Sequence, residues 1–177
     1  MTVDKEQKLL VDDAGSSESQ SQLRAALAKA YRLLAVRARS EKELRDALAR
    51  AQFVEAIIDV AVEDCKQQRF IDDANFARQF IQSRRRNRPM GRQRLAIELR
   101  QKGVDAEIIA TALDEFFAEQ TQLALADQLA EKQRKRLANL PPPKARQRLA
   151  DFLRRRGFDW ETIQGTKVWK DLMVEPD

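Results

Sequence analysis

An apolar pattern that recurs after 51 residues is the feature of this sequence that most constrains its fold. Five apolar residues of the first copy are spaced as one face of a helix. They and their counterparts are Ile57, Ile58, Ala61, Val62 and Cys65, then Ile108, Ile109, Ala112, Leu113 and Phe116. Such a period is typical of repeat proteins, in which small units bury their apolar faces against one another.

The segment before each of these faces repeats as well. Leu44 corresponds to Leu95, and a third copy follows 54 residues later with Leu149. Gly103 and Gly157 occupy the same place after the second and third copies, where a helix end favours a left-handed residue. The first copy has Gln52 at this place, so we expect its turn to be built differently.

The pattern therefore predicts an all-α fold of three tandem three-helix repeats, which together form an elongated, curved helical body. We place these repeats at residues 23–70, 71–118 and 119–173. Residues 1–22 are polar and aperiodic, and we expect a disordered acidic N-terminal tail there. Residues 174–177 form a C-terminal tail.

The third repeat departs most from the pattern. Gly165 interrupts its last helix, and the polar residues Thr166 and Lys167 occupy positions where the other repeats have core residues. We expect Trp160, Trp169 and Leu172 to form an alternative core at the end of the chain.

Composition supports helices and an anionic partner. Glycine and proline number only five each, which argues against an all-β chain with its many turns. Residues 1–20 carry five acids and two bases, a net charge of −3, and the chain total of +5 leaves +8 for the remainder. A basic body of this kind favours nucleic acid, a nucleoprotein or an acidic protein as partner.

The residues expected in catalytic or metal sites are scarce. There is no histidine, and the single cysteine, Cys65, lies on an apolar helix face, so we interpret it as a core residue. Asp72 is placed to cap a helix and Asp73 to face that helix's dipole, which explains this carboxylate pair without metal or acid–base chemistry. We therefore predict no enzymatic activity, no cofactor and no metal.

The sequence also bears on location. No apolar run approaches the roughly 20 residues that a membrane span needs, and the polar N-terminus is unlike a signal peptide. A single cysteine cannot form an internal disulfide, so we expect a protein of the reducing cytoplasm.

Basic clusters are the candidate contact residues. They recur near helix ends in successive repeats, so we expect them to align along one side of the molecule. Arginine predominates, which suits forked contacts to phosphate or carboxylate, and the few nearby aromatics argue against base stacking. The candidates are Arg84, Arg85, Arg86, Arg88, Arg92, Arg94, Lys132, Arg134, Lys135, Arg136, Arg154, Arg155 and Arg156.

Three stretches resemble the RecX family, and the resemblance extends over about residues 23–173. They are residues 69–81, beginning Arg69-Phe70-Ile71-Asp72-Asp73, residues 91–104, beginning Gly91-Arg92-Gln93-Arg94-Leu95, and Ser40-Glu41-Lys42-Glu43-Leu44-Arg45. The resemblance implies three tandem three-helix repeats. It also implies a protein that binds RecA and RecA–single-stranded DNA filaments, blocks filament extension, and inhibits recombinase, ATPase and co-protease activity. Such a protein would negatively regulate recombination, DNA repair and the SOS response.

We expect such a protein to inhibit RecA by the place it occupies on the filament. A basic body, which we expect to be monomeric, would lie in the filament groove and bridge more than one RecA protomer, with Arg84 to Arg92 facing RecA carboxylates or DNA phosphates. Weak direct DNA binding is compatible with this hypothesis. Two alternatives stay open: a stand-alone basic helical DNA-binding protein, since three-helix units resemble helix-turn-helix domains, and a scaffold for another acidic protein.

Overall fold

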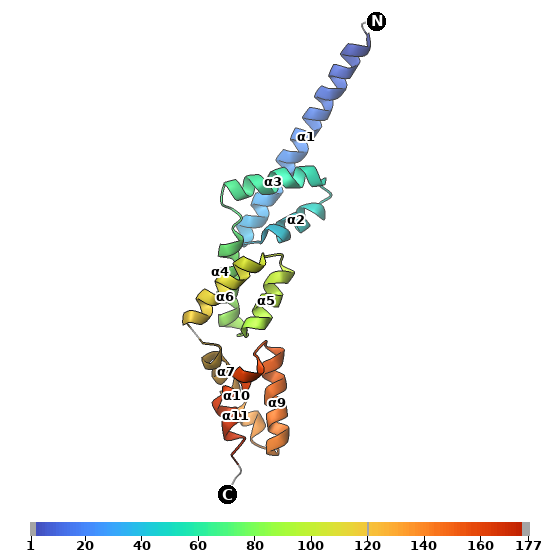
Figure 1. Ribbon diagram of the computed structural model, residues 1–177. Helices are drawn as coiled ribbons and strands as arrows, with labels where there is room; N and C mark the ends of the chain where they lie inside the picture. Colours follow the sequence, from blue (N-terminus) through green and yellow to red (C-terminus); the bar gives the residue numbers. More distant parts are fainter. Residues whose placement is uncertain (1–2, 120, 175–177) are drawn as a thin grey trace. The chain divides into compact units, whose positions relative to one another are not determined.

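The computed structural model describes residues 3–119 and 121–174, and every regular element in these ranges is a helix (Figure 1). The helices are α1 (Val3–Val36), α2 (Glu41–Ala49), α3 (Glu55–Gln67), α4 (Asp73–Asn87), α5 (Arg92–Gln101), α6 (Ala106–Glu119), α7 (Gln122–Glu131), α8 (Arg134–Leu137), α9 (Pro142–Arg155), α10 (Trp160–Gly165) and α11 (Lys167–Asp171). The predicted all-α class is confirmed for the described residues. The elongated, curved shape stays a prediction.

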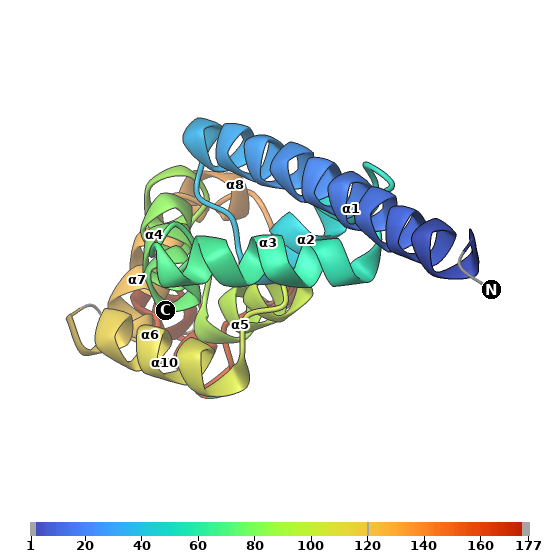
Figure 2. The same ribbon diagram turned by 90° about the horizontal axis from the view of Figure 1, so that it is seen from above.

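The chain divides into two compact units, residues 1–76 and 77–177. In the first unit α1 and α3 lie side by side, as Figure 2 shows, and α2 packs against both. Its buried core combines residues of all three helices and the following turn: Ala26, Ala30, Leu44, Leu48, Ile58, Ala61, Val62, Cys65 and Ile71. Cys65 is fully buried, as predicted, and burial raises the pKa of its thiol.

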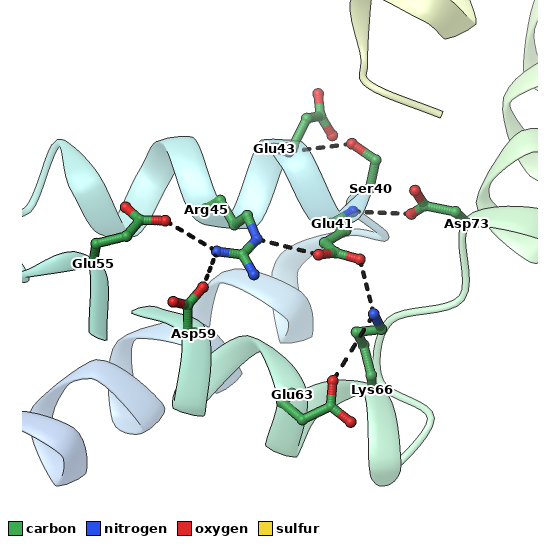
Figure 3. A network of polar contacts seen from close by, with 9 residues as sticks. All are labelled: Ser40, Glu41, Glu43, Arg45, Glu55, Asp59, Glu63, Lys66 and Asp73. Carbon is green, nitrogen blue, oxygen red and sulfur yellow. Dashed lines mark hydrogen bonds and ion pairs between the residues drawn. The ribbon is translucent and has the colours of Figure 1, made fainter. Parts of the chain in front are cut away.

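Polar contacts fix the helix ends of this unit (Figure 3). The Ser40 hydroxyl accepts a hydrogen bond from the Glu43 amide at 3.2 Å, and the Asp73 carboxylate accepts one from the Glu41 amide at 2.9 Å. Two of the free N–H groups of α2 are thereby satisfied, one of them by a residue of α4. Asp72 caps α4 by accepting the Asn75 amide at 2.8 Å, as predicted.

The turn between α2 and α3 corrects one expectation. Gln52 has φ 66°, in the same left-handed region as Gly103 at 79° and Gly157 at 86°. The Phe53 amide donates to the Leu48 carbonyl at 3.4 Å, and the other two turns contain the equivalent bond. The turn is therefore built as in the other repeats, because these hydrogen bonds and the packing of Phe53 against the core offset the backbone cost of a non-glycine residue.

The N-terminal segment also differs from expectation. α1 begins at Val3, so residues 3–22 continue a helix where we predicted a disordered tail. Glu, Gln, Lys and Leu all favour helix, and extending a helix that is already anchored by packing is easier than starting one. The absence of an apolar stripe in this segment therefore did not indicate disorder. Residues 1–2 lie outside the described part of the chain, as do residues 175–177 of the predicted C-terminal tail.

The third repeat has a core of its own around α7 and α9. Its buried residues are Leu125, Ala126, Leu129, Ala130, Leu137, Ala145, Leu149, Ala150, Leu153, Phe158, Ile163 and Val168. Thr166 is buried, as predicted, and its hydroxyl donates to the Ile163 carbonyl at 2.8 Å. Lys167 is exposed, which corrects the prediction, because the break after Gly165 turns α11 so that Val168 enters the core.

The two tryptophans pack edge to face, with ring centroids 5.2 Å apart. Trp169 and Leu172 are partly buried against the core, as predicted, but Trp160 is 50% exposed. Trp160 therefore lies at the edge of this core and not inside it. It follows directly on the Asp159 cap of α10, at the surface end of that helix.

Candidate anion-binding surface

All thirteen basic residues predicted as contacts lie in the second unit. They occupy the C-terminal end of α4 and the start of α5, the α7–α8 connection, and the C-terminal end of α9. The structure brings the first and third of these clusters together, and the contacts between α5 and the end of α9 explain how.

Two hydrogen bonds join the segment before α5 to the end of α9. The Gly91 amide donates to the Arg156 carbonyl at 2.8 Å, and the Arg156 guanidinium donates to the Pro89 carbonyl at 3.0 Å. A third bond, from the Arg92 amide to the Gln122 side chain at 3.1 Å, holds the start of α5 against α7. The arginines that flank Pro89 and those that end α9 therefore surround one junction.

Arg156 has a structural part in this junction. It is partly buried and lies over the Phe152 ring, with the guanidinium carbon 4.6 Å from the ring centroid. Burial, and then the nearby charge of Arg88, lowers the pKa of Arg156. A cation held between a ring and a backbone carbonyl in this way is not free to bind a partner.

Three further candidates are paired with carboxylates. Arg84 and Arg94 share Glu98, at 2.9 and 3.1 Å, and Arg92 pairs with Asp114 at 2.7 Å. Arg84 also lies over the Phe80 ring. These contacts stay within the second unit, so the three side chains are engaged before any partner arrives.

Five candidates remain available at the junction, and we call them the basic junction: Arg85, Arg86, Arg88, Arg154 and Arg155. All are exposed or partly exposed, and in the described part of the chain none forms an ion pair with a carboxylate. Arg85 lies 6.0 Å from the Phe116 ring centroid. This concentration of accessible guanidinium groups suits an anionic surface that offers several oxygen acceptors.

The remaining cluster lies apart. Lys132, Arg134, Lys135 and Arg136 precede α9, whose 14 residues separate them from Arg154 by about 20 Å along the helix. Arg134 pairs with Asp171 and Glu131, and the hydrogen bond to Asp171 is the main cause that raises its pKa. Two of the clusters are thus neighbours, whereas the third is separated from them by the length of α9, and the alignment of all clusters along one side stays a prediction.

Sequence reasoning missed two exposed basic residues, Lys144 and Arg148, on α9 itself. They stand four residues apart, and Arg155 follows seven residues after Arg148, so the three share one face of the helix. That spacing was readable from the sequence, but the residues are isolated cations and were overlooked in favour of contiguous runs. The pairing of Arg94 with Glu98, four residues apart on one helix, was also readable from the sequence. The pairing of Arg84 with Glu98 and of Arg92 with Asp114 needed the tertiary structure.

No group of three or more His, Cys, Asp or Glu side chains in the described residues, 3–119 and 121–174, could hold a metal ion. None of the helices in these ranges is long and apolar enough to cross a membrane.

Comparison with known protein families gives three matches in the order of the repeats. Residues 26–65 match the first three-helix domain of RecX, residues 72–113 the second and residues 120–165 the third. Each matched segment lies within one predicted repeat.

Curated relatives carry the same name. A regulatory protein RecX of Pelodictyon phaeoclathratiforme is 33% identical over 139 residues, which cover 78% of this chain and 84% of the relative. The regulatory protein RecX of Mycolicibacterium vanbaalenii is 41% identical over 102 residues, or 58% of this chain. The chain spans 55% of the length of that relative and 65% of the one from Prosthecochloris aestuarii.

Two solved structures share the fold. The crystal structure of RecX from Lactobacillus salivarius superimposes with a TM-score of 0.76 at 21% identity, covering 86% of this chain and 97% of that one. A second crystal structure of a regulatory protein RecX gives a TM-score of 0.80 at 24% identity, covering 90% and 77%.

Proposed function

The chain belongs to the RecX family of regulatory proteins, and from this premise we propose that it binds RecA and RecA–single-stranded DNA filaments and inhibits their extension. The consequences would be lower recombinase, ATPase and co-protease activity, and so negative regulation of recombination, DNA repair and the SOS response. In this proposal the protein acts by binding in the cytoplasm, without catalysis or a cofactor.

The basic junction is the observation that carries the proposal. Five accessible arginines from α4, α9 and the segment before α5 gather around one contact, and no carboxylate of the described residues neutralises them. Like charges held close together repel one another, and an anionic partner relieves that repulsion. RecA carboxylates and the phosphates of its bound strand both offer the oxygen acceptors that guanidinium groups prefer.

We propose that the chain bridges more than one RecA protomer through these arginines. A bridge of this kind obstructs the addition of the next protomer and the path of an incoming duplex. Arg86 and Arg88 are the side chains expected to contribute most, since both are exposed and neither makes an intramolecular ion pair in the described part of the chain.

The test is RecA-dependent ATP hydrolysis on single-stranded DNA, measured with increasing amounts of the full chain. We expect inhibition at amounts well below those of RecA, because one bound molecule at a filament end stops many additions. Binding to naked single-stranded DNA is measured beside it at physiological salt, and it should be weaker.

The matched variants are Arg86→Ala/Arg88→Ala and Arg24→Ala/Arg32→Ala. Each removes two exposed arginines, the first pair from the basic junction and the second from α1. At roughly 0.7 kcal/mol for each charged contact, the junction variant should inhibit about 10-fold less well, whereas the α1 variant should match the wild type. Equal inhibition by both variants would show that Arg86 and Arg88 of the basic junction do not contribute to binding the RecA filament.

A wild-type chain that leaves RecA unaffected and yet binds naked DNA tightly and salt-sensitively would favour the stand-alone DNA-binding protein. The family membership would then account for the fold alone.

A further inference from the structure

α9 has two contrasting faces. One is buried and consists of Ala145, Leu149, Ala150 and Leu153. The other is exposed and basic: Lys144, Arg148 and Arg155 are aligned by their spacing, and Arg154 flanks them. We call these four residues the α9 basic face. Its ends lie 11 residues apart, which is about 16 Å along a helix.

The cations of this face, like those of the basic junction, are not neutralised within the described part of the chain. Some exposed cations of other helices are paired with a carboxylate of the same helix, as in Lys42 with Asp46 and Arg94 with Glu98. On the α9 basic face no cation forms an ion pair with any described residue, although Asp151 is only three residues from Arg148. The like charges of Lys144 and Arg148, four residues apart on one helix face, repel each other.

We propose that the α9 basic face binds the phosphate backbone of a single-stranded nucleic acid and continues the basic junction along α9. The proposal deepens the proposed function and rests on it for the biological setting, the DNA strand within a RecA filament. Arg154 and Arg155 belong to both surfaces, so one strand can follow the cations from the junction to Lys144.

The composition of this face favours a phosphate backbone over an acidic protein. Protein interfaces have an apolar core with aromatic residues, whereas nucleic-acid interfaces are polar and strongly positive. The large exposed apolar residues of the described chain, such as Val36, Phe70 and Trp160, all lie outside α9. Three cations share one face of the helix over 11 residues, with Asp151 at the turn between Arg148 and Arg155, and such a row suits a polymer with regularly spaced charges.

The character of the contacts also follows from the residues. α9 begins with Pro142 and Pro143, which lack N–H groups, so side chains rather than the helix N-terminus must supply the contacts. Phe152 lies under the Arg156 guanidinium and is not free to stack on a base. Binding should therefore depend on salt and be indifferent to sequence.

The experiment measures the fluorescence anisotropy of a labelled oligothymidylate of about 30 nucleotides with the full chain at several salt concentrations. For Lys144→Ala/Arg148→Ala we expect affinity to fall about 10-fold at low salt. The slope of log affinity against log salt should become shallower by about 1.4, since each phosphate that a cation neutralises on a single strand contributes about 0.7 to it. Alanine favours helix, so α9 should persist, and circular dichroism checks this.

Arg24→Ala/Arg32→Ala again serves as the matched control and should keep the wild-type slope and affinity. The proposal is overturned if the wild type does not bind the oligonucleotide, or if Lys144→Ala/Arg148→Ala binds it like the wild type. Should that variant keep oligonucleotide binding but lose inhibition of RecA, the face contacts an acidic protein instead. A wild type that binds the strand through α9 and leaves RecA unaffected supports this inference and contradicts the proposed function.

Discussion

Gly91 and Gly157 approach so closely that a β-carbon on Gly91 would lie 2.4 Å from the Gly157 carbonyl oxygen. A β-carbon on Gly157 would in turn lie 2.4 Å from the backbone nitrogen of Arg94, in the first turn of α5. Gly91 belongs to the second three-helix domain and Gly157 to the third. The absence of two side chains thus allows the backbones of these domains to meet, and the basic junction forms around this contact.

Gly91→Ala should destabilise the protein by about 2 kcal/mol, as overpacking of a rigid backbone contact does. The φ of Gly91 is −74°, so any loss comes from the contact and not from backbone strain. Gly165→Ala is the control, because its new methyl group would meet only the flexible end of Leu123. Urea unfolding compares the two, and an equal, small effect of both would show that the backbones can separate without cost.

Arg156→Ala should lower the free energy of unfolding by about 1 kcal/mol, since it removes the hydrogen bond to Pro89 and the stacking on Phe152. Arg155→Ala removes the same type of side chain from an exposed position and should change stability by less than about 0.5 kcal/mol. Thermal unfolding of both variants is the measurement. A larger loss from Arg155→Ala would contradict the structural part assigned to Arg156.

Gln52→Gly should stabilise the protein by roughly 0.5–1 kcal/mol, because Gln52 holds a left-handed conformation with φ 66° that costs an ordinary residue more than glycine. Ala49→Gly, three residues earlier in the last turn of α2, should instead destabilise by about 1 kcal/mol. Chemical denaturation measures the free energy of unfolding of both variants. If Gln52→Gly lowers it, the contacts of the Gln52 side chain stabilise the fold by more than the left-handed backbone conformation costs.

The carboxylates of Asp73 and Glu41 should give opposite pH dependences. Burial, above all, raises the pKa of Asp73, so its contribution to stability is full below the ordinary aspartate pKa of about 3.9 and decreases as pH rises through its folded pKa. Burial alone would raise the pKa of Glu41 too, but hydrogen bonds from Arg45 and Lys66 lower it overall. Its contribution is therefore present at neutral pH and lost in acid.

Relative to the wild type, Asp73→Asn should become more stable as pH rises from about 4 to about 7, because asparagine keeps an acceptor for the Glu41 amide without a buried charge. Glu41→Gln should become less stable over the same range. Both effects should be of the order of 1 kcal/mol or less, since the groups are partly solvated. Urea midpoints at each pH measure them, and trends of the same sign would contradict the assignment.

The local features were predictable because they depend on neighbours in the chain. The helix faces around Leu44, Leu95 and Leu149, and the caps at Ser40, Asp72 and Asp159, follow from spacings of a few residues. The wrong expectations at Gln52 and over residues 3–22 arose where a weak local preference was overruled by hydrogen bonding or by the continuation of a packed helix.

The sequence by itself determined the helical repeat, its number of copies and the excess of arginine, since period and charge are properties of the linear chain. Only the tertiary structure decided which arginines are free. Arg156 and Pro89 are 67 residues apart, and their hydrogen bond brings two clusters together. Packing of the helices pairs Arg84 with Glu98 and Arg92 with Asp114, so these two arginines are already engaged by carboxylates. Such contacts depend on how helices pack, because a charge is neutralised by what lies near it in space.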